Sequence, residues 1–319
     1  MLDVSAQAER STTYRADMAD HIVTRQTAAR VILDHPGFGV SLQGDPTDSI
    51  EALRSRMARF SDGAVHERRR RNVDRVLHGL DAAQLRVRVF DLAAARLRPG
   101  CDLLPHARTI PLEAVAGLWG FEDPPGVAAG LLQLVDRLAP RTDDPVRPSA
   151  DEVQSVLDQW FVDPTDEDVA RISVFFQTAD ATAALIVAAA ETLLPWRSGG
   201  EPAIDDVAAV ATSRETVTST TRRAQATITI DERAIGAGET VIVRLDPDLA
   251  FGSGRHRCPG REHALAAATG FVVALHHAGL WAAPSSRLQP RPNISLPQRV
   301  ICRPDSETKE NMIGEDQHR

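Results

Sequence analysis

The sequence predicts a single, mainly α-helical domain with a small β region. Apolar residues recur at helical spacing along most of the chain up to residue 194, β-branched or alternating runs gather after residue 200, and no internal repeat or low-complexity linker divides the chain. Of its 319 residues, 43% are hydrophobic and 25% are charged. This composition supports a sizeable core and excludes collagen-like, coiled-coil and wholly disordered chains.

The expected helices follow the spacing of apolar residues. The clearest spans 166–194, where Val169, Ile172 and Phe176 begin a stripe spaced by three and four positions and Pro195 is a stop signal. The other expected helices are 15–33, 48–59, 64–98 (one or two helices), 112–119, 126–139, 150–160 and 261–278.

The expected strands are short and lie in the C-terminal third. They are 216–221, 226–230, 240–245 and 294–302, with a turn at 235–238. The domain is expected to cover residues 1–303, and the charged segment 304–319 is expected to be a mobile tail.

Charge and cysteine usage exclude several classes of protein. The net charge is −8, from 44 acidic and 36 basic residues, and a general nucleic-acid binder would carry a basic excess. Cys101, Cys258 and Cys302 have no short repeated spacing, so neither a disulfide framework nor a zinc ribbon is expected. The N-terminus is polar, and the longest apolar stretch, 181–194, contains Glu191. We therefore expect a soluble, cytoplasmic protein with no membrane partner.

The loop 251–260 contains the most informative residues. Its sequence, FGSGRHRCPG, places Cys258 just before an expected helix. A cysteine that binds a metal must be a thiolate, and backbone N–H groups at a helix N-terminus stabilise that charge. Glycines allow the backbone to lie close to a large planar ligand. The loop therefore indicates a haem-binding cysteine.

Two other interpretations of Cys258 remain open at this point. The cysteine could be a buried structural residue, or it could share a zinc ion with His256, His263 and His276. No paired Cys-x-x-Cys spacing accompanies these histidines, which disfavours zinc.

The loop resembles the cysteine-ligand signature of the cytochrome P450 family, Phe-Gly-x-Gly-x-His/Arg-x-Cys-x-Gly, at all six fixed positions. The resemblance implies a P450-like fold and haem b as cofactor. It also assigns the residues of the loop: Cys258 as proximal thiolate ligand, His256 on a haem propionate, Phe251 near the sulfur, and Gly252, Gly254 and Gly260 in the backbone that faces the haem.

Two more segments resemble propionate-binding parts of that family. Residues 62–71 are similar to Asp-Pro-Pro-x-His-x-x-x-Arg with both prolines replaced, which assigns His66 and Arg70 to the propionates. The run 222–224 is similar to the family's Arg-x-Ala strand, which makes Arg222 a third partner. The neighbouring arginines Arg68, Arg69 and Arg71 are read as a solvated face, with docking of an acidic ferredoxin as the alternative.

The expected central helix departs from the family at its catalytic motif. Where the family has Ala-Gly-x-Asp-Thr, this chain keeps the acid as Asp180, has Ala181 at the alcohol and has Thr178 at the glycine. The resemblance implies proton delivery by Asp180, with Thr178 or Thr182 substituting for the missing hydroxyl through an ordered water. The alternative is that Asp180 is only a buried polar group of the helix.

A second departure concerns the Glu-x-x-Arg pair of the family. The aligned positions are Ala209 and Thr212, which cannot form an ion pair, and the meander that receives the pair is reduced to 245–250. The segment before the central helix is also short, so we expect a reduced lid over a more open pocket.

Three functions follow from the resemblance. The first is a haem-thiolate monooxygenase acting on a small molecule in specialised natural-product biosynthesis, with a ferredoxin as possible electron donor. The second is a haem-thiolate enzyme with peroxide-dependent or non-redox chemistry such as dehydration, isomerisation or cyclisation, which the substitution at Ala181 favours. The third is a non-catalytic auxiliary protein, which the retained Cys258 disfavours.

Overall fold

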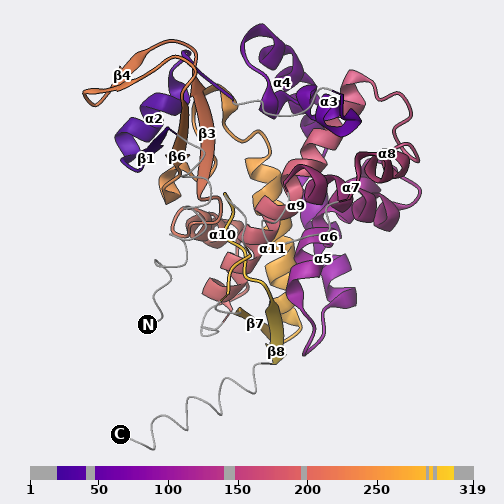
Figure 1. Cartoon of the computed structure of the whole chain (residues 1–319). Coiled ribbons are helices and arrows are strands. Elements are labelled where there is room, and N and C mark those ends of the chain that lie inside the picture. The colour runs from indigo at the N-terminus through magenta and orange to yellow at the C-terminus, as the bar shows by residue number, and fades with distance from the viewer. Residues whose placement is uncertain are drawn as a thin grey trace, which may run out of the picture.

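The computed structural model describes residues 20–40, 47–139, 148–194, 200–284, 287–289 and 293–304. A small sheet with one helix lies to one side of a larger helical body (Figure 1). Several sequence expectations fall outside these ranges: the start of the helix at 15–33, the stop signal at Pro195 and the tail beyond residue 304.

Helices make up most of the described chain, which confirms the mainly α-helical expectation. They are α2 (Gln26–Asp34), α3 (Ser49–Ser55), α4 (Gly63–His78), α5 (Ala82–Arg96), α6 (Leu103–Leu118), α7 (Pro124–Leu138), α8 (Ala150–Leu157), α9 (Asp166–Leu193), α10 (Ile204–Ala211) and α11 (Arg261–His277).

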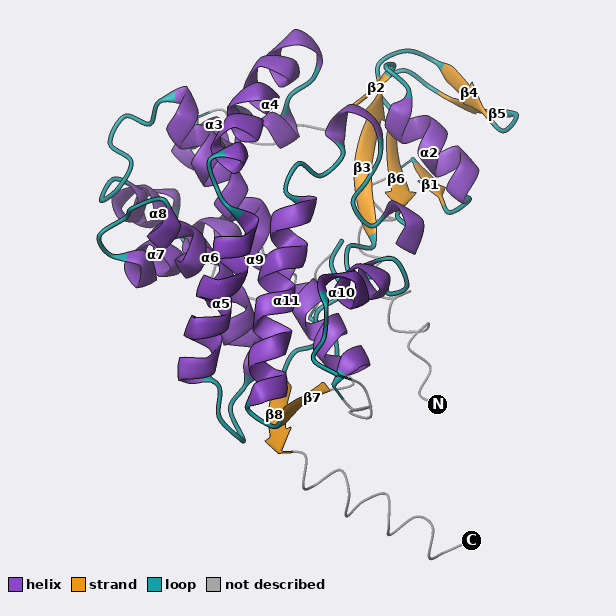
Figure 2. Ribbon diagram, turned by 180° about the vertical axis from the view of Figure 1, so that it is seen from behind, coloured by secondary structure: helices purple, strands orange, loops and turns teal. Residues whose placement is uncertain are grey.

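The central helix α9 lies where the apolar stripe predicted it. Thr165 and Asp168 form a reciprocal capping box at its start, which satisfies two backbone N–H groups that have no partner within the helix. Among the described residues, α9 is the one helix long and apolar enough to cross a membrane, but 78% of its most apolar window is buried inside the protein. Figure 2 shows it in the helical body beside α6 and α11. It is a core helix of the fold.

The small β region consists of a four-stranded sheet and two strand pairs. The sheet has the order β1-β6-β3-β2, in which β1 is parallel to β6 and the other pairs are antiparallel. The strands are β1 (His21–Val23), β2 (Phe38–Gly39), β3 (Ser219–Ala224), β4 (Ile228–Ile230), β5 (Arg233–Ile235), β6 (Thr240–Arg244), β7 (Leu280–Pro284) and β8 (Val300–Pro304).

The β-branched strands bury one face of the sheet under α2. Ile32 of α2 and Val241 of β6 are fully buried and belong to one apolar cluster with Phe38. This cluster is separate from the main core, which fills the helical body. The sheet therefore has its own small core, and β3 is held firmly at its register with β6, where Arg222 lies opposite Val241.

The structure corrects the expected boundaries of α6. The sequence predicted a helix at 112–119, but α6 begins at Leu103, after Asp102 caps it. Pro111 lies inside the helix and lines a cavity, and it is buried. A proline is usually a helix stop because it removes one hydrogen bond. Here the surrounding apolar contacts outweigh that cost, so the expectation of a later start was wrong.

Other boundaries were also wrong. The described part of the expected helix 15–33 contains β1 before α2 begins at Gln26, and 48–59 is α3 followed by a short 3-10 turn. Helix α10 and strand β7 were not predicted. Strand β7 pairs with β8, which spans residues 300–304, whereas the sequence predicted a strand at 294–302. These errors arose because short elements depend on their tertiary partners more than on local sequence.

Helices α5 and α11 approach each other unusually closely at Gly270. A Cβ atom at this position would lie 2.2 Å from the backbone oxygen of Arg86 in α5. The contacting atom is backbone, so no side-chain rotation can make room. Helix α11, which follows Cys258, can therefore pack this closely on α5 only because residue 270 is a glycine and has no Cβ atom.

We predict that Gly270→Ala destabilises the protein by about 2 kcal/mol, because the two helices must separate. The matched control is Gly117→Ala in α6, where the nearest atom to the new Cβ would be 3.7 Å away. That control should be neutral or stabilising by about 0.5–1 kcal/mol, since alanine favours helix over glycine. Urea unfolding measures both, and equal effects of the two substitutions would contradict the packing argument.

Candidate functional site

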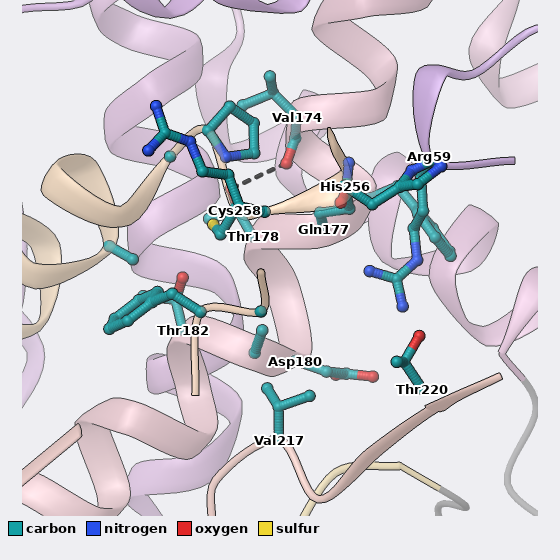
Figure 3. A pocket seen from close by; sticks show the side chains of 18 of the residues that line it. Arg59, Val174, Gln177, Thr178, Asp180, Thr182, Val217, Thr220, His256 and Cys258 are labelled. Carbon is teal, nitrogen blue, oxygen red and sulfur yellow. Dashed lines mark hydrogen bonds between the residues drawn. The ribbon is translucent and has the colours of Figure 1, made fainter. Parts of the chain in front are cut away.

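A cavity of about 680 Å³ lies between the sheet, α9 and the cysteine loop. It brings together the residues singled out by the sequence: Figure 3 shows Cys258, His256, Asp180, Thr178 and Thr182 around it. His66, Arg70, Arg222, Phe251, Gly252 and Gly260 also line the cavity. Of the expected site residues, Gly254 alone does not line it.

Cys258 lies in the loop between a 3-10 turn (Gly254–His256) and α11, with its side chain exposed to the cavity. Its backbone N–H donates to the oxygen of Phe251 at 2.8 Å, which closes the loop. Desolvation raises the pKa of the Cys258 thiol, although the backbone N–H of Gly260 and the charges of Arg70 and Arg59 oppose this. A cation bound to the sulfur would lower this pKa and stabilise the thiolate.

The glycines of the loop serve different purposes. Gly252 and Gly254 have φ of +68° and +66°, a region that disfavours side chains. A Cβ on Gly254 would lie 2.7 Å from the backbone oxygen of Leu33 in α2, so this glycine allows the loop to pack on α2. The nearest atom to a Cβ on Gly260 would be 3.9 Å away, on Leu77. Close approach to a planar ligand therefore explains Gly254 less well than its contact with α2.

Arg222 of β3 places a buried guanidinium in the cavity. Its side chain donates hydrogen bonds to the hydroxyl of Thr220 and the carbonyl of Thr221, both at 2.9 Å and both neutral. Desolvation lowers the pKa of Arg222 to about 10. The positive charges of Arg59 and Arg255 also lower this pKa, whereas the negative charge of Asp62 raises it. The charge is therefore only partly compensated by the protein.

Two histidines lie beside this guanidinium. The rings of His66 and His256 are 4.1 Å apart, and His256 Nε2 is 3.2 Å from a carboxylate oxygen of Asp62. Desolvation, with Arg222 and His66 nearby, lowers the pKa of His256 to about 3. Within the described chain, His66 Nδ1 is buried and makes no hydrogen bond. One carboxylate thus faces several nitrogen groups.

Arg70 connects α4 to the cysteine loop. Its guanidinium donates to the carbonyl of Arg257 at 2.8 Å and to Asp74 at 2.8 Å. The hydrogen bonds seen here hold the loop against α4, and the side chain also borders the cavity. Phe251 lies under Arg261, whose guanidinium carbon is 5.3 Å from the ring centre.

These features fit the expected haem. A haem carries two carboxylates and needs one axial ligand, and the lining of the cavity includes a thiol, an incompletely neutralised guanidinium and an orphaned imidazole nitrogen. The guanidinium and the imidazole nitrogen are costly to bury unless an anion joins them. The residues present therefore suit a dianionic group held by Cys258.

The zinc interpretation does not fit the geometry. His263 Nε2 is 2.8 Å from the carbonyl oxygen of Leu80, and His276 packs against His277 near the end of α11. Among the described residues, which include all four candidate ligands, no group of three or more His, Cys, Asp or Glu side chains could hold a metal ion. The expected alternative of a zinc site is therefore wrong.

The acid of the central helix is held in an ion-pair network that the sequence did not reveal. Asp180 is 4% exposed, and one of its carboxylate oxygens accepts a hydrogen bond from Arg108 Nε at 2.8 Å. Arg108 also donates to Asp136 of α7 at 2.9 Å. Desolvation would lower the pKa of Arg108, but the two carboxylates outweigh it and raise the pKa. The network joins α6, α7 and α9.

The threonine hydroxyls near Asp180 differ in their hydrogen bonding. Thr178 donates to the carbonyl of Val174 at 2.8 Å, one turn earlier in α9, as the dashed line in Figure 3 marks. Thr182 is buried and lines the cavity. Ala181 also lines it and has no hydroxyl. Thr182 is thus the better placed of the two candidate hydroxyls, because that of Thr178 is already bonded to the helix backbone.

A different ion pair lies near the missing Glu-x-x-Arg position. Ala209 and Thr212 make no ion pair, but Arg214, which follows α10, donates to Glu191 of α9 at 2.8 Å. Desolvation raises the pKa of Glu191, although Arg214 opposes this. The pair ties the end of α9 to the chain after α10. No local spacing signals it, since its members are 23 positions apart.

The chain has the cytochrome P450 fold, as comparison with solved structures shows. No family model matches the sequence, and no curated protein matches it. The similar structures are distant in sequence, so they establish the fold and leave the reaction open.

The cytochrome P450 PksS of the Bacillus subtilis 168 bacillaene polyketide synthase superposes with a TM-score of 0.72 at 15% identity, covering 93% of this chain and 96% of that one. CYP109E1 from Bacillus megaterium, in complex with testosterone, superposes with a TM-score of 0.68 at 16% identity, covering 95% of this chain and 99% of that one. P450BioI, in complex with an acyl carrier protein, superposes with a TM-score of 0.70 at 17% identity, covering 94% of this chain and 99% of that one.

We predict that Arg222→Met stabilises the haem-free protein by about 2 kcal/mol near neutral pH. The pKa of Arg222 is lower in the folded than in the unfolded chain, so at every pH below about 10 the charged form costs the folded state free energy. Arg223→Met on the same strand is the control, because Arg223 is exposed. Denaturant unfolding at pH 7 tests this, and a less stable Arg222→Met protein would overturn it.

Proposed function

We propose that this protein is a haem-thiolate oxidoreductase that monooxygenates a small molecule, with Cys258 as the iron ligand. The observation that carries the proposal is the cavity that both the Cys258 thiol and the incompletely neutralised Arg222 line. A natural-product substrate is favoured because several structures with this fold act in such biosynthesis, including RauA with an aurachin RE intermediate.

The chain's own residues would hold the cofactor by charge and ligation. The Cys258 thiol would lose its proton on binding iron, and Arg222, His66 and His256 would face the two propionates of haem b, with Arg70 keeping the loop on α4. The bound haem would supply activation of dioxygen or peroxide. Arg222 would then gain the anionic partner that its burial lacks.

Proton delivery in this proposal depends on Asp180 and Thr182. Asp180 borders the cavity while paired with Arg108, so it can release or accept a proton only by weakening that pair. Thr182 would supply a hydroxyl in place of the one that Ala181 lacks, and Thr178 would contribute only after leaving the Val174 carbonyl. The relay is therefore weaker than an acid-alcohol pair.

The locked Asp180 and the missing hydroxyl favour a second candidate, a haem-thiolate enzyme that uses peroxide or performs non-redox chemistry. Such reactions do not need protons delivered to bound dioxygen. Thr182 would then act on the substrate itself, and Asp180 would do so only after weakening its pair with Arg108. A non-catalytic auxiliary role is a third candidate, which the intact cysteine loop disfavours.

The proposed partners are a small-molecule substrate and a ferredoxin. Arg68 and Arg71 are exposed on α4, whereas Arg69 donates to the carbonyl of Ser55 at 2.6 Å. The two exposed arginines would be the part of this face available to an acidic donor. We propose a cytoplasmic location, because three cysteines without a disulfide are typical of a reducing compartment.

We predict that Cys258→Ser abolishes the red-shifted Soret band of the ferrous-CO complex, because a serine hydroxyl replaces the thiolate ligand. Cys101→Ser is the matched control, since Cys101 lies outside the cavity lining. Absorbance spectra of the haem-reconstituted proteins measure the effect. A Cys258→Ser protein with an unchanged band would refute the ligand assignment and, with it, the proposed function.

We predict that Ala181→Thr raises product formed per electron about tenfold, in a reaction supplied with dioxygen, a reductant, a ferredoxin and a surrogate substrate. The added hydroxyl would complete the relay beside Asp180. Ala181→Val is the control, because valine has the shape of threonine without its hydroxyl. If neither substitution changes the product formed per electron, and if hydrogen peroxide alone supports product formation, the second candidate function is favoured over monooxygenation.

A further inference from the structure

The two cysteines outside the cavity lie opposite each other. Asp102 and Ile301 form an antiparallel β-bridge, so Cys101 and Cys302 occupy directly facing positions. The backbone N–H of Cys302 donates to the carbonyl of Cys101 at 3.0 Å, and that of Gly100 donates to the carbonyl of Cys302 at 2.7 Å. Facing residues of this kind have Cα atoms about 4.5–5.5 Å apart, which is within the range that a disulfide spans.

The two thiols also differ in their access to solvent. Desolvation raises the pKa of the Cys302 thiol, and the neighbouring Cys101 raises it further. Cys302 is fully buried, whereas Cys101 is partly exposed. A soluble oxidant therefore meets Cys101 first, and the resulting group already has a second sulfur beside it.

We propose that Cys101 and Cys302 are an oxidation site, closed to a disulfide by hydrogen peroxide, that fastens the C-terminal strand β8 to the start of α6. The Cys101 sulfur attacks the peroxide O–O bond, which breaks, and gives a sulfenic acid and one water. The Cys302 sulfur then attacks the sulfenic sulfur, forms the S–S bond and releases a second water. The two thiol protons leave in the two waters, and the peroxide is reduced by the two electrons that the thiols lose.

The cross-link would join parts of the fold that are distant in sequence. Asp102 caps α6 and also accepts a hydrogen bond from the backbone N–H of Val300 at 3.1 Å, so β8 and the first turn of α6 already share one carboxylate. A disulfide beside this contact closes a loop that contains α6 through α11. Constraint of so long a loop lowers the entropy of the unfolded chain and stabilises the fold. The site is independent of the proposed haem function.

The test treats the purified full-length protein with a small excess of hydrogen peroxide. The thiol count after unfolding should fall from three to one, and mass spectrometry should find the Cys101 and Cys302 peptides linked, with the loss of two hydrogens. The melting temperature should rise by about 5 °C and return on treatment with dithiothreitol. Repetition in Cys258→Ser, where the count should fall from two to zero, removes the third thiol from the measurement.

Cys101→Ser is the control and should show no linked peptide and no rise in melting temperature. Because this variant keeps the buried Cys302 and changes only the partly exposed Cys101, the interior packing is unchanged and the protein should fold. Cys302→Ser is the second variant. Links that involve Cys258 or a second chain would overturn the proposal. So would a Cys101 that stops at the sulfenic or sulfinic acid beside a free Cys302, or a disulfide that leaves the melting temperature unchanged or lower.

Discussion

The cost of burying positive charge at the cavity is the constraint on which the rest of the site depends. Arg222 has neutral hydrogen-bond acceptors, and Asp62 is shared with His256. The helical core, the sheet under α2 and the hydrogen bonds of Arg70 keep these groups in place, although burial lowers the pKa of Arg222 and so disfavours its charged form. A protein retains such an arrangement when an anionic ligand repays it.

The ion pairs of this chain differ from those that the resemblance implied. The positions of the Glu-x-x-Arg pair hold Ala209 and Thr212, while Glu191 and Arg214 connect α9 to the chain after α10. Likewise, the acid of the central helix has Arg108 as its partner. Each pair places opposite charges together between separate parts of the fold, so this chain connects them through ion pairs of its own.

The cysteine loop and the central helix could be predicted because their information is local. Cys258 and its glycines form one short run, and the apolar stripe of α9 repeats along one segment. Arg108 and Asp180 could not be paired in this way, since 72 positions separate them and many arginines are available. The start of α6 was missed because Pro111 signals a stop that tertiary packing overrides.

The contact of Gly254 with α2 limits how this chain can change. Two atoms exclude a side chain there: Oδ1 of Asp34 and the main-chain oxygen of Leu33, the second of which every amino acid carries. No replacement within α2 can therefore act as a second-site suppressor of a larger residue at 254. Only a shift of the whole helix could, and that shift would disturb the small core formed with Ile32. Position 254 should therefore tolerate fewer substitutions than position 260, which lines the cavity and where a Cβ atom would have more room.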